Sequence, residues 1–474
     1  MRISADQGIR KSHQVTILVP GHHHGCQVFK IDLVDNTRRR RHDPEIIKSL
    51  LPPPQELIAL AIALKFNFRI SPEGIRNGEE IYLHGMIDHQ VNRNQRVDFL
   101  RVPTLSMYSR PHRSKVHHSW NPGEILHDHA PGKERHGWLR RQVRPPAGQV
   151  KVKVAWCGLC GTDLHEYLGG PLYIPADGPH PLTGAQAPVI LGHEMSGDVV
   201  EVGAGVTRVK VGDRVALCPI IGCLKCQWCR SGLMGLCTNI AFLGISWHGG
   251  GFAQVVNVYE YMCYRLPAEV SYEVGSLVEP FAATYRALKQ AAVQLGETVA
   301  IVGAGPIGLM ALQSARIQGA QQVIAIEPAA KRQELARRCG ATAVVDPRRE
   351  DVLAVVRELT KGEGADVVIE CSGIEATGIL AGRIARRKGR VVVMGVFEHP
   401  APIDYTDIVY GEKIVTGSMG GYGVFDEAIQ AMANGKFDGD LLITGKIKLD
   451  GILSGLDALI KHKDDNVKIL VSPL

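Results

Sequence analysis

Four cysteines fall within one short stretch of the 474-residue chain, at a spacing that suits a metal ion. Cys223, Cys226 and Cys229 repeat at intervals of three, and Cys237 follows eight residues later. A compact loop can turn four such thiolates toward one point, and four sulfur ligands leave a zinc ion no open coordination position. The pattern therefore predicts a structural zinc that stabilises a loop with little core of its own. Packing of reduced cysteines is the alternative, but it leaves the regular spacing unexplained.

A second group has the ligand types of a metal site with an exchangeable position. Cys160 is followed 33 residues later by His193 and Glu194, and Glu279 offers a further carboxylate. A thiolate, an imidazole and a carboxylate are the ligand mixture of a catalytic zinc. Each is weak evidence alone, because a His–Glu pair is usually an ordinary core or surface pair. Cys157 precedes Cys160 by three residues, but a thioredoxin-like context is absent, so we assign Cys157 to packing.

Residues 303–308, Gly-Ala-Gly-Pro-Ile-Gly, match the glycine fingerprint of dinucleotide-binding folds. The motif follows an apolar run at 298–302 and precedes a helical pattern at 309–318, which is the context that makes the match specific. The glycines would make a tight turn, let a pyrophosphate approach the backbone and allow close helix packing. A glycine-rich turn without a cofactor is the alternative. The predicted cofactor contacts here are Val302, Gly303, Gly305, Pro306, Ile307 and Gly308.

The choice between NAD and NADP is predicted from the end of the next apolar run, residues 323–326. This run ends at Glu327, about 20 residues beyond the last glycine, where a carboxylate accepts hydrogen bonds from the adenosine ribose and repels a 2′-phosphate. Glu327 therefore favours NAD. Lys331 and Arg332 are near enough to weaken that preference and to contact the cofactor, or they form the solvated face of the next helix.

Charge, cysteine content and apolar runs limit the partners and the compartment that we expect for this protein. The net charge of +6 is modest for this length, so we expect no nucleic-acid partner. Eleven cysteines, four of them in one stretch, suit metal ligation in a reducing compartment, which predicts a cytoplasmic protein. Residues 1–11 lack an apolar signal region, and the longest apolar run, 57–64, is too short to span a bilayer, so we expect no membrane association.

The elements that position these residues form three regions. Residues 1–138 hold 13 of the 19 histidines without a sustained apolar pattern, and we expect a poorly ordered extension. His22, His23 and His24 could bind a metal, but tracts of this kind are usually solvated. Residues 139–285 contain short strands punctuated by glycine, whereas 286–420 alternate apolar runs with helical stretches, as in a doubly wound parallel α/β sheet. Residues 421–474 carry two amphipathic helices and a closing strand that we expect to complete the first module.

From about Gln149 to Leu474 the chain resembles the zinc-containing medium-chain dehydrogenases, which join a GroES-like catalytic domain to a Rossmann domain. Within that family, residues 154–167, 179–184 and 277–280 look like the butanediol dehydrogenases. The resemblance implies a catalytic zinc on Cys160, His193 and Glu279, with Glu194 beside it. It also implies reversible hydride transfer between NAD and a secondary alcohol or vicinal diol, and we expect a homo-oligomer, a dimer or a tetramer.

The same resemblance assigns the catalytic proton path. Thr162 matches the family's hydroxyl relay, and His165 would pass the proton to solvent because a histidine pKa lies near the working pH. Without the family match, Thr162 is as readily a hydroxyl bonded to backbone. Cys218–Pro219 departs from the family, because Glu-Pro is expected there.

Other functions stay open at this point. Sorbitol, xylitol and threonine are alternative substrates within the same family. The strands that precede Val150 in the family are represented only by fragments such as 143–146, which leaves a non-catalytic nucleotide-binding relative as the alternative from a different class. Metal content separates the two classes, because the enzyme needs two zinc ions and the non-catalytic relative only one.

Overall fold

The computed structural model describes residues 12–21, 25–34, 67–69, 84–86 and 144–473. The chain forms two compact units, Met1–Ser114 and Lys115–Leu474. Each unit is described by itself below.

The described part of the first unit consists of two antiparallel strand pairs. Strand β1 (Ser12–Gly21) pairs with β2 (Gly25–Val34), and β3 (Asn67–Arg69) pairs with β4 (His84–Met86). These strands fall within the segment predicted to be an extension. The candidate metal-binding residues His22, His23 and His24 lie outside the described residues.

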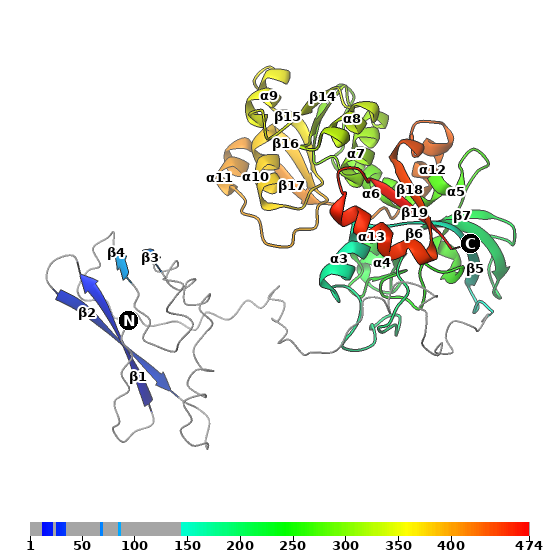
Figure 1. The fold of residues 1–474 in the computed structure, drawn as a ribbon, viewed down its shortest axis with the longest axis horizontal. Helices are drawn as coiled ribbons and strands as arrows, with labels where there is room; N and C mark the ends of the chain where they lie inside the picture. Colours follow the sequence, from blue (N-terminus) through cyan, green and yellow to red (C-terminus); the bar gives the residue numbers. More distant parts are fainter. Residues whose placement is uncertain (1–11, 22–24, 35–66, 70–83, 87–143, 474) are drawn as a thin grey trace. The chain divides into compact units, whose positions relative to one another are not determined.

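A seven-stranded sheet opens the second unit, in the order β11-β7-β6-β5-β19-β18 with β10 also paired to β5. Its strands are β5 (Gln149–Gly158), β6 (Glu194–Val202), β7 (Arg214–Leu217), β10 (Val255–Tyr259), β11 (Cys263–Arg265), β18 (Ile443–Lys448) and β19 (Lys468–Ser472). A separate pair, β8 (Ile220–Ile221) and β9 (Ala241–Phe242), borders the cysteine loop. In Figure 1 the red strand β19 lies beside β5, from which it is far removed in sequence, and β18 lies on the other side of β19.

The residue pattern explains the central strand β5. Val150, Val152 and Val154 are fully buried, because alternate residues of a strand point to one face of the sheet. Lys153 points to the other face and is exposed. Lys151 is buried and forms an ion pair with Glu201 on β6.

The second sheet is parallel and six-stranded, in the order β14-β13-β12-β15-β16-β17. Its strands are β12 (Thr298–Val302), β13 (Gln322–Ile326), β14 (Ala343–Val345), β15 (Ala365–Glu370), β16 (Ala385–Val393) and β17 (Ile414–Gly417). The order reverses between β12 and β15, which is the switch point where doubly wound folds bind their ligands. The predicted fold class, a β-rich module joined to a doubly wound parallel sheet, is confirmed.

Helices connect and cover both sheets. They are α3 (Gly161–Gly169), α4 (Gln227–Arg230), α5 (Tyr272–Ser276), α6 (Val278–Gln290), α7 (Pro306–Ile317), α8 (Ala330–Arg338), α9 (Val352–Leu359), α10 (Glu375–Ile384), α11 (Tyr405–Gly411), α12 (Phe425–Ala433) and α13 (Ile452–Lys461). One-turn 3₁₀ helices are η3 (Met234–Leu236), η4 (Glu260–Met262), η5 (Asp440–Leu442) and η6 (Leu449–Gly451).

Cys157, which sequence analysis assigned to packing, and four further cysteines lie in or against the cores. Cys157 and Cys263 belong to the core of the first sheet. Cys218 and Cys339 are buried in the core that runs between the two sheets, and Cys371 packs against it. Cys218 therefore occupies an apolar environment, and burial raises its pKa to about 12.

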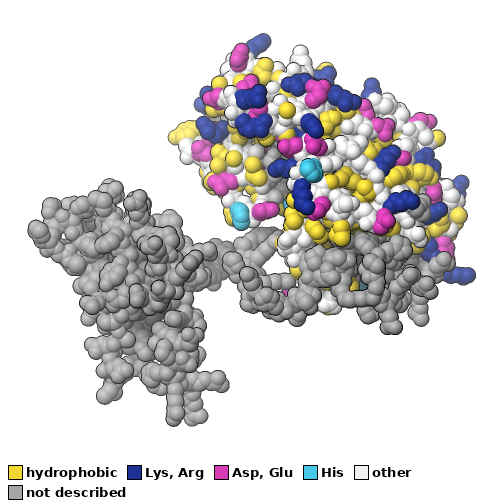
Figure 2. All heavy atoms as spheres, viewed as in Figure 1, with side chains coloured by type: hydrophobic (Ala, Val, Ile, Leu, Met, Phe, Trp, Pro, Cys, Tyr) yellow, Lys and Arg dark blue, Asp and Glu magenta, His cyan; other side chains and the backbone are white. Residues whose placement is uncertain are grey.

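Charges are mixed on the visible described surface. Figure 2 shows basic and acidic side chains interleaved there, without one large patch of a single sign. Within the described residues, no helix is both long and apolar enough to cross a membrane.

Candidate active site

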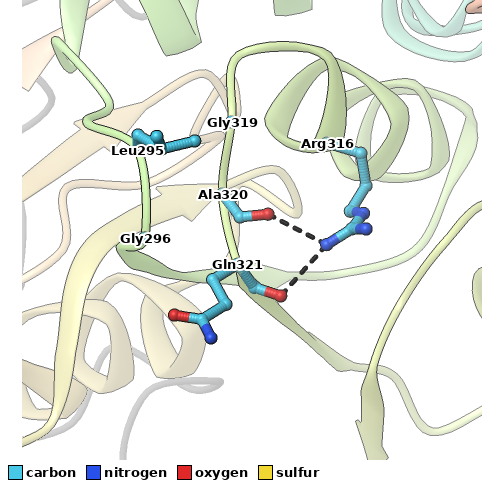
Figure 3. A pocket seen from close by; sticks show the side chains of 6 residues that line it. All are labelled: Leu295, Gly296, Arg316, Gly319, Ala320 and Gln321. Carbon is cyan, nitrogen blue, oxygen red and sulfur yellow. Dashed lines mark hydrogen bonds between the residues drawn. The ribbon is translucent and has the colours of Figure 1, made fainter.

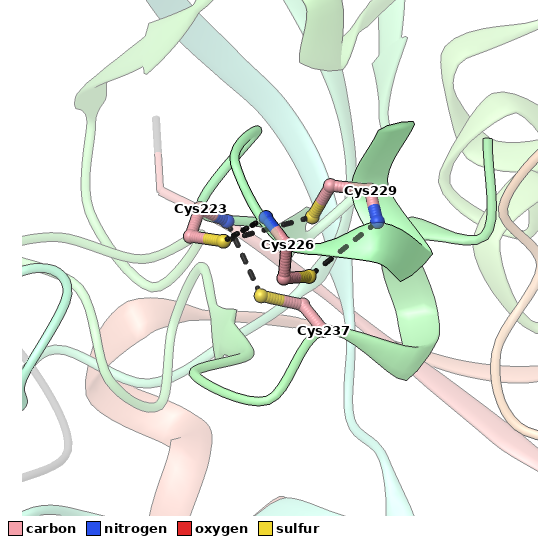
Figure 4. Close-up of side chains that lie close together, drawn as sticks. All are labelled: Cys223, Cys226, Cys229 and Cys237. Atoms are coloured by element: carbon pink, nitrogen blue, oxygen red, sulfur yellow. Dashed lines mark hydrogen bonds between the residues drawn. The ribbon is translucent and has the colours of Figure 1, made fainter. Parts of the chain in front are cut away.

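The four cysteines of the predicted structural site converge on one point (Figure 4). Their sulfur atoms all lie within 4.8 Å of one another. The Sγ atoms of Cys223 and Cys229 are 4.0 Å apart, close to the roughly 3.8 Å expected between sulfurs on a tetrahedral zinc with 2.3 Å bonds. The donor set therefore fits a closed zinc site with ligands Cys223, Cys226, Cys229 and Cys237.

Backbone N–H groups favour negative charge on the sulfurs of Cys223, Cys226 and Cys237, whereas burial raises the pKa of Cys229 to about 12. The N–H groups of Cys226 and Cys223 donate to Cys223 Sγ and Cys237 Sγ at 3.3 Å each. Cys226 caps the short helix α4, and the N–H of Cys229 donates to its sulfur at 3.5 Å. That hydrogen bond is the main cause that lowers the pKa of Cys226 to about 6. A thiolate is the form that binds metal.

A second group brings together Cys160, His193 and Glu194, whose ligand atoms also lie within 4.8 Å of one another. Cys160 is the N-cap of α3, His193 directly precedes β6, and Glu194 is the first residue of β6. His193 and Glu194 are buried. The start of α3 and the start of β6 therefore bring a thiolate, an imidazole and a carboxylate together, and this donor set fits zinc.

Glu194 has a partner that sequence analysis did not identify. Lys468, the first residue of β19, places Nζ 2.8 and 2.6 Å from the two carboxylate oxygens of Glu194, and it also donates to the Leu159 carbonyl at 3.1 Å. Both side chains are buried. The only available sequence signal was a lysine at the start of an otherwise apolar strand.

Asp163 is a second site residue that sequence analysis missed. Its Oδ2 accepts a hydrogen bond from the Cys160 N–H at 3.0 Å, and its Oδ1 faces His193 Nδ1 at 3.6 Å. Neither of these facing atoms has a hydrogen-bond partner in the described part of the chain. Burial lowers the pKa of the His193 imidazole, but the negative charges of Cys160 and Asp163 raise it more, so the net pKa is well above its usual value.

Glu279 lies near this group but outside it. It stands in the first turn of α6 and is not among the residues within 4.8 Å. Burial raises its pKa to about 7, while His193 lowers it and Glu194 raises it, so all three groups share one electrostatic environment. The geometry thus places Glu194 with Cys160 and His193, whereas the family resemblance implied Glu279 with Glu194 beside it.

The two residues of the predicted proton path lie on one helix. Thr162 Oγ1 is 3.8 Å from Cys160 Sγ. His165 follows three residues later on α3, which places the two side chains on neighbouring positions of the helix surface. His165 is half-buried.

The glycine-rich turn has the geometry that its sequence predicts. Gly303 has a φ of +92°, and a side chain there would meet Ser372 Oγ at 2.1 Å. A Cβ at Gly308 would lie 1.8 Å from the Gly303 carbonyl oxygen, whereas nothing lies within 4 Å of a Cβ at Gly305. The turn leads into α7 with Pro306 in its first turn. Gly303 and Gly308 are thus required for packing, and Gly305 leaves open space where a pyrophosphate would approach.

Glu327 directly follows β13 and reaches back to this turn. Its buried carboxylate accepts hydrogen bonds from the N–H of Ala304 at 2.7 Å and of Ala329 at 2.9 Å. Arg332 donates to the Lys463 carbonyl oxygen. Glu327 therefore connects the turn with the end of β13, and its oxygens keep free lone pairs for a ribose.

A shallow pocket lies at the other end of the same strands (Figure 3). It is lined by Leu295, Gly296, Arg316, Gly319, Ala320 and Gln321, which surround the amino ends of β12 and β13. The Arg316 guanidinium donates to the carbonyls of Ala320 and Gln321. None of the predicted site residues lines this pocket.

Known proteins are similar to this chain in sequence. A family model described as an alcohol dehydrogenase GroES-like domain matches residues 146–268, and one described as a zinc-binding dehydrogenase matches residues 306–434. The (R,R)-butanediol dehydrogenase of Bacillus subtilis is 43% identical over 327 residues, which span 69% of this chain and 93% of that protein.

Solved structures agree with the sequence matches. The crystal structure of 2R,3R-butanediol dehydrogenase from Bacillus subtilis has a TM-score of 0.67 and 42% identity, covering 70% of this chain and 95% of that one. An NADP-bound zinc-binding dehydrogenase from Sinorhizobium meliloti has a TM-score of 0.63 and 34% identity, covering 70% and 94%. The chain therefore belongs to the zinc-containing medium-chain dehydrogenases, as the cysteine spacing and the glycine-rich turn had indicated.

Proposed function

We propose that the protein is an NAD-linked dehydrogenase that oxidises vicinal diols of the 2,3-butanediol type, and reduces the corresponding acyloins, at the group Cys160, His193 and Glu194. The observation that carries this proposal is the convergence of these three ligand atoms within 4.8 Å at a buried point. The substrate class is taken from the butanediol dehydrogenase of Bacillus subtilis, which shares 43% identity with the chain.

The chain's own residues prepare the site for the reaction. Bound zinc would supply a Lewis acid for the substrate hydroxyl, and bound nicotinamide would take up the hydride. Cys160 and His193 would hold the metal together with a carboxylate, either Glu194 or Glu279. Asp163 orients His193, and Lys468 balances the charge of Glu194.

The proton released from the substrate must leave a buried site. We assign its transfer to the Thr162 hydroxyl, which lies beside the Cys160 sulfur, and then to His165 on the same helix. A neutral imidazole can accept this proton near neutral pH and return it to solvent.

Glu327 supports the preference for NAD. Its buried carboxylate ends β13 beside the glycine-rich turn, where it would repel a 2′-phosphate. The relative from Sinorhizobium meliloti binds NADP, so the assays compare both nucleotides.

The domain division and the assembly complete the proposal. Residues 139–285 and 421–474 would form the catalytic domain and 286–420 the nucleotide-binding domain, since β19 pairs with β5.

A second copy of the chain would cover the edge strand β17, where Ile414 and Val415 are exposed, and the exposed Tyr405 and Tyr410 of α11. We propose such a homo-oligomer, a dimer or a tetramer, in the cytoplasm.

Parallel assays test the function. Reduction of NAD and of NADP is compared with 2,3-butanediol, sorbitol, xylitol and threonine, and the zinc content is measured on the same preparation. The proposal expects about two zinc ions per chain and the highest kcat/KM with butanediol and NAD. About one zinc per chain without turnover would instead support a non-catalytic nucleotide-binding relative.

A further inference from the structure

Two basic residues lie close to the carboxylate that follows β13. Lys331 and Arg332 are in the first turn of α8, four and five positions beyond Glu327. A cationic side chain in this place is the usual means by which a dinucleotide-binding domain accepts the 2′-phosphate of NADP. Glu327 alone therefore does not account for a preference for NAD.

Both residues are already engaged by one loop from the other end of the chain. This loop, residues 462–467, connects α13 with β19 and is called the α13–β19 loop below. Lys331 Nζ forms an ion pair with Asp465 Oδ1, and the Arg332 guanidinium donates to the Lys463 carbonyl oxygen. The loop thus brings a carboxylate and a carbonyl to the two groups that a 2′-phosphate would need.

A third cation beside the same position is held in a similar way. Arg348 donates to both carboxylate oxygens of Asp346 at 3.1 Å and to the Pro328 carbonyl oxygen. Asp346 chiefly, followed by Asp464 and Glu327, raises the pKa of Arg348. Asp464 of the α13–β19 loop is therefore within electrostatic reach of the third cation.

One donor near the ribose position remains available. The Nε atom of Arg332 is buried and has no acceptor among the residues that the structure describes. An N–H group in this state is costly unless a ligand or water accepts its hydrogen bond. A ribose hydroxyl, which both NAD and NADP carry, would satisfy this atom.

We propose that the α13–β19 loop determines cofactor specificity by masking Lys331 and Arg332, with Asp465 as the principal residue. NADP must displace Asp465 from Lys331 before its 2′-phosphate gains an ion pair, whereas NAD has no such requirement. This inference rests on the proposed nucleotide site, and it adds a second determinant to Glu327. Removal of Asp465 would open the site to NADP without adding any new basic residue.

The test measures binding, so that it does not depend on turnover of any alcohol. Adenosine 2′,5′-bisphosphate and AMP, which differ only in the 2′-phosphate, are titrated calorimetrically into the zinc-loaded full chain and its Asp465→Asn variant. We expect the variant to bind the bisphosphate about fivefold more tightly, which corresponds to the energy of one exposed ion pair. Its affinity for AMP should be unchanged. The same ratio is then measured for NADP and NAD.

Two further variants separate masking from a general change of charge or stability. Asp457→Asn removes an exposed carboxylate on α13 that pairs with Lys461, and it should leave the ratio of the two affinities unchanged. In the wild-type chain, where Lys331 is masked, Lys331→Gln should change the affinity for the bisphosphate little. In the Asp465→Asn background it should abolish the gain in that affinity.

The outcomes decide the proposal. A selective gain for the 2′-phosphate ligand that requires Lys331 supports it. An unchanged affinity ratio in Asp465→Asn, an equal gain in Asp457→Asn, or a gain that persists without Lys331 would each overturn it. Failure of both nucleotides to bind the wild-type chain would instead remove the proposed function, which keeps the two failures distinguishable.

Discussion

Lys468 Nζ lies 2.6 Å from Glu194 Oε2, and both side chains are buried, although 274 positions separate them in the sequence. The pair joins the closing strand β19 to β6, the strand that carries Glu194 of the candidate metal group. Lys468, near the end of the chain, therefore contributes to the same site as Glu194 of β6.

We predict that Lys468→Met destabilises the protein by about 3–5 kcal/mol, because it removes the ammonium that contacts both oxygens of the buried Glu194 carboxylate. The measurement is the thermal unfolding midpoint at a fixed zinc concentration. Lys446→Met on β18 is the control, since Lys446 pairs with Glu273 in an exposed position, and its loss should cost less than about 1 kcal/mol. Equal shifts for the two variants would contradict the prediction.

The Lys468–Glu194 pair is a contact that the sequence could not predict. The cysteine loop and the glycine-rich turn are local, so their spacing alone indicated a zinc site and a nucleotide-binding turn. Contacts between distant strands have no such signal, and Lys468 was therefore missed. The carboxylate beside Cys160 and His193 likewise depends on how α6 and β6 pack, and the family resemblance therefore implied Glu279 as the ligand, whereas the geometry brings Glu194 to the group.

Replacement of Cys160 by serine should abolish turnover and reduce the zinc content from about two ions per chain to about one, because serine is a poor zinc ligand. NAD binding should persist, since the glycine-rich turn does not involve Cys160. Zinc is measured by atomic emission and NAD binding by calorimetry. Diol oxidation that survives removal of the metal from the wild-type enzyme would refute a zinc mechanism.

Glu327→Ala should raise the KM for NAD about tenfold, because hydrogen bonds from the ribose to a charged acceptor are lost. The KM for NADP should rise less or fall, since a negative charge near the 2′-phosphate is removed. The measurement is kcat/KM with each nucleotide. Glu327→Gln is the control for the loss of charge, as its single amide oxygen can still accept one of the two hydrogen bonds that the N–H groups of Ala304 and Ala329 donate. An unchanged preference would show that the ribose assignment is wrong.

Thr162→Val should lower kcat about 100-fold while zinc content and NAD affinity stay near wild type, because the proton loses its first acceptor. Thr162→Ser should restore most of the rate, which a purely structural role for the methyl group would not predict. His165→Gln should lower kcat and change its dependence on pH, since glutamine cannot accept the proton and pass it to solvent. A wild-type pH profile in His165→Gln would exclude this histidine from the proton path.

Asp163→Asn should weaken zinc binding at the Cys160 group by about 10–100-fold, the usual effect of losing a carboxylate that supports a histidine ligand. The asparagine retains an oxygen that can accept the Cys160 N–H, so the change acts chiefly on the charge that faces His193 Nδ1. A competitive titration with a chromophoric chelator resolves the two zinc ions, and the cysteine loop should keep its affinity. Asp213→Asn is the control, because Asp213 accepts a hydrogen bond from the Lys210 N–H in an exposed turn. Equal zinc affinities in the two variants would mean that Asp163 only closes the first turn of α3 and does not support the metal ligand.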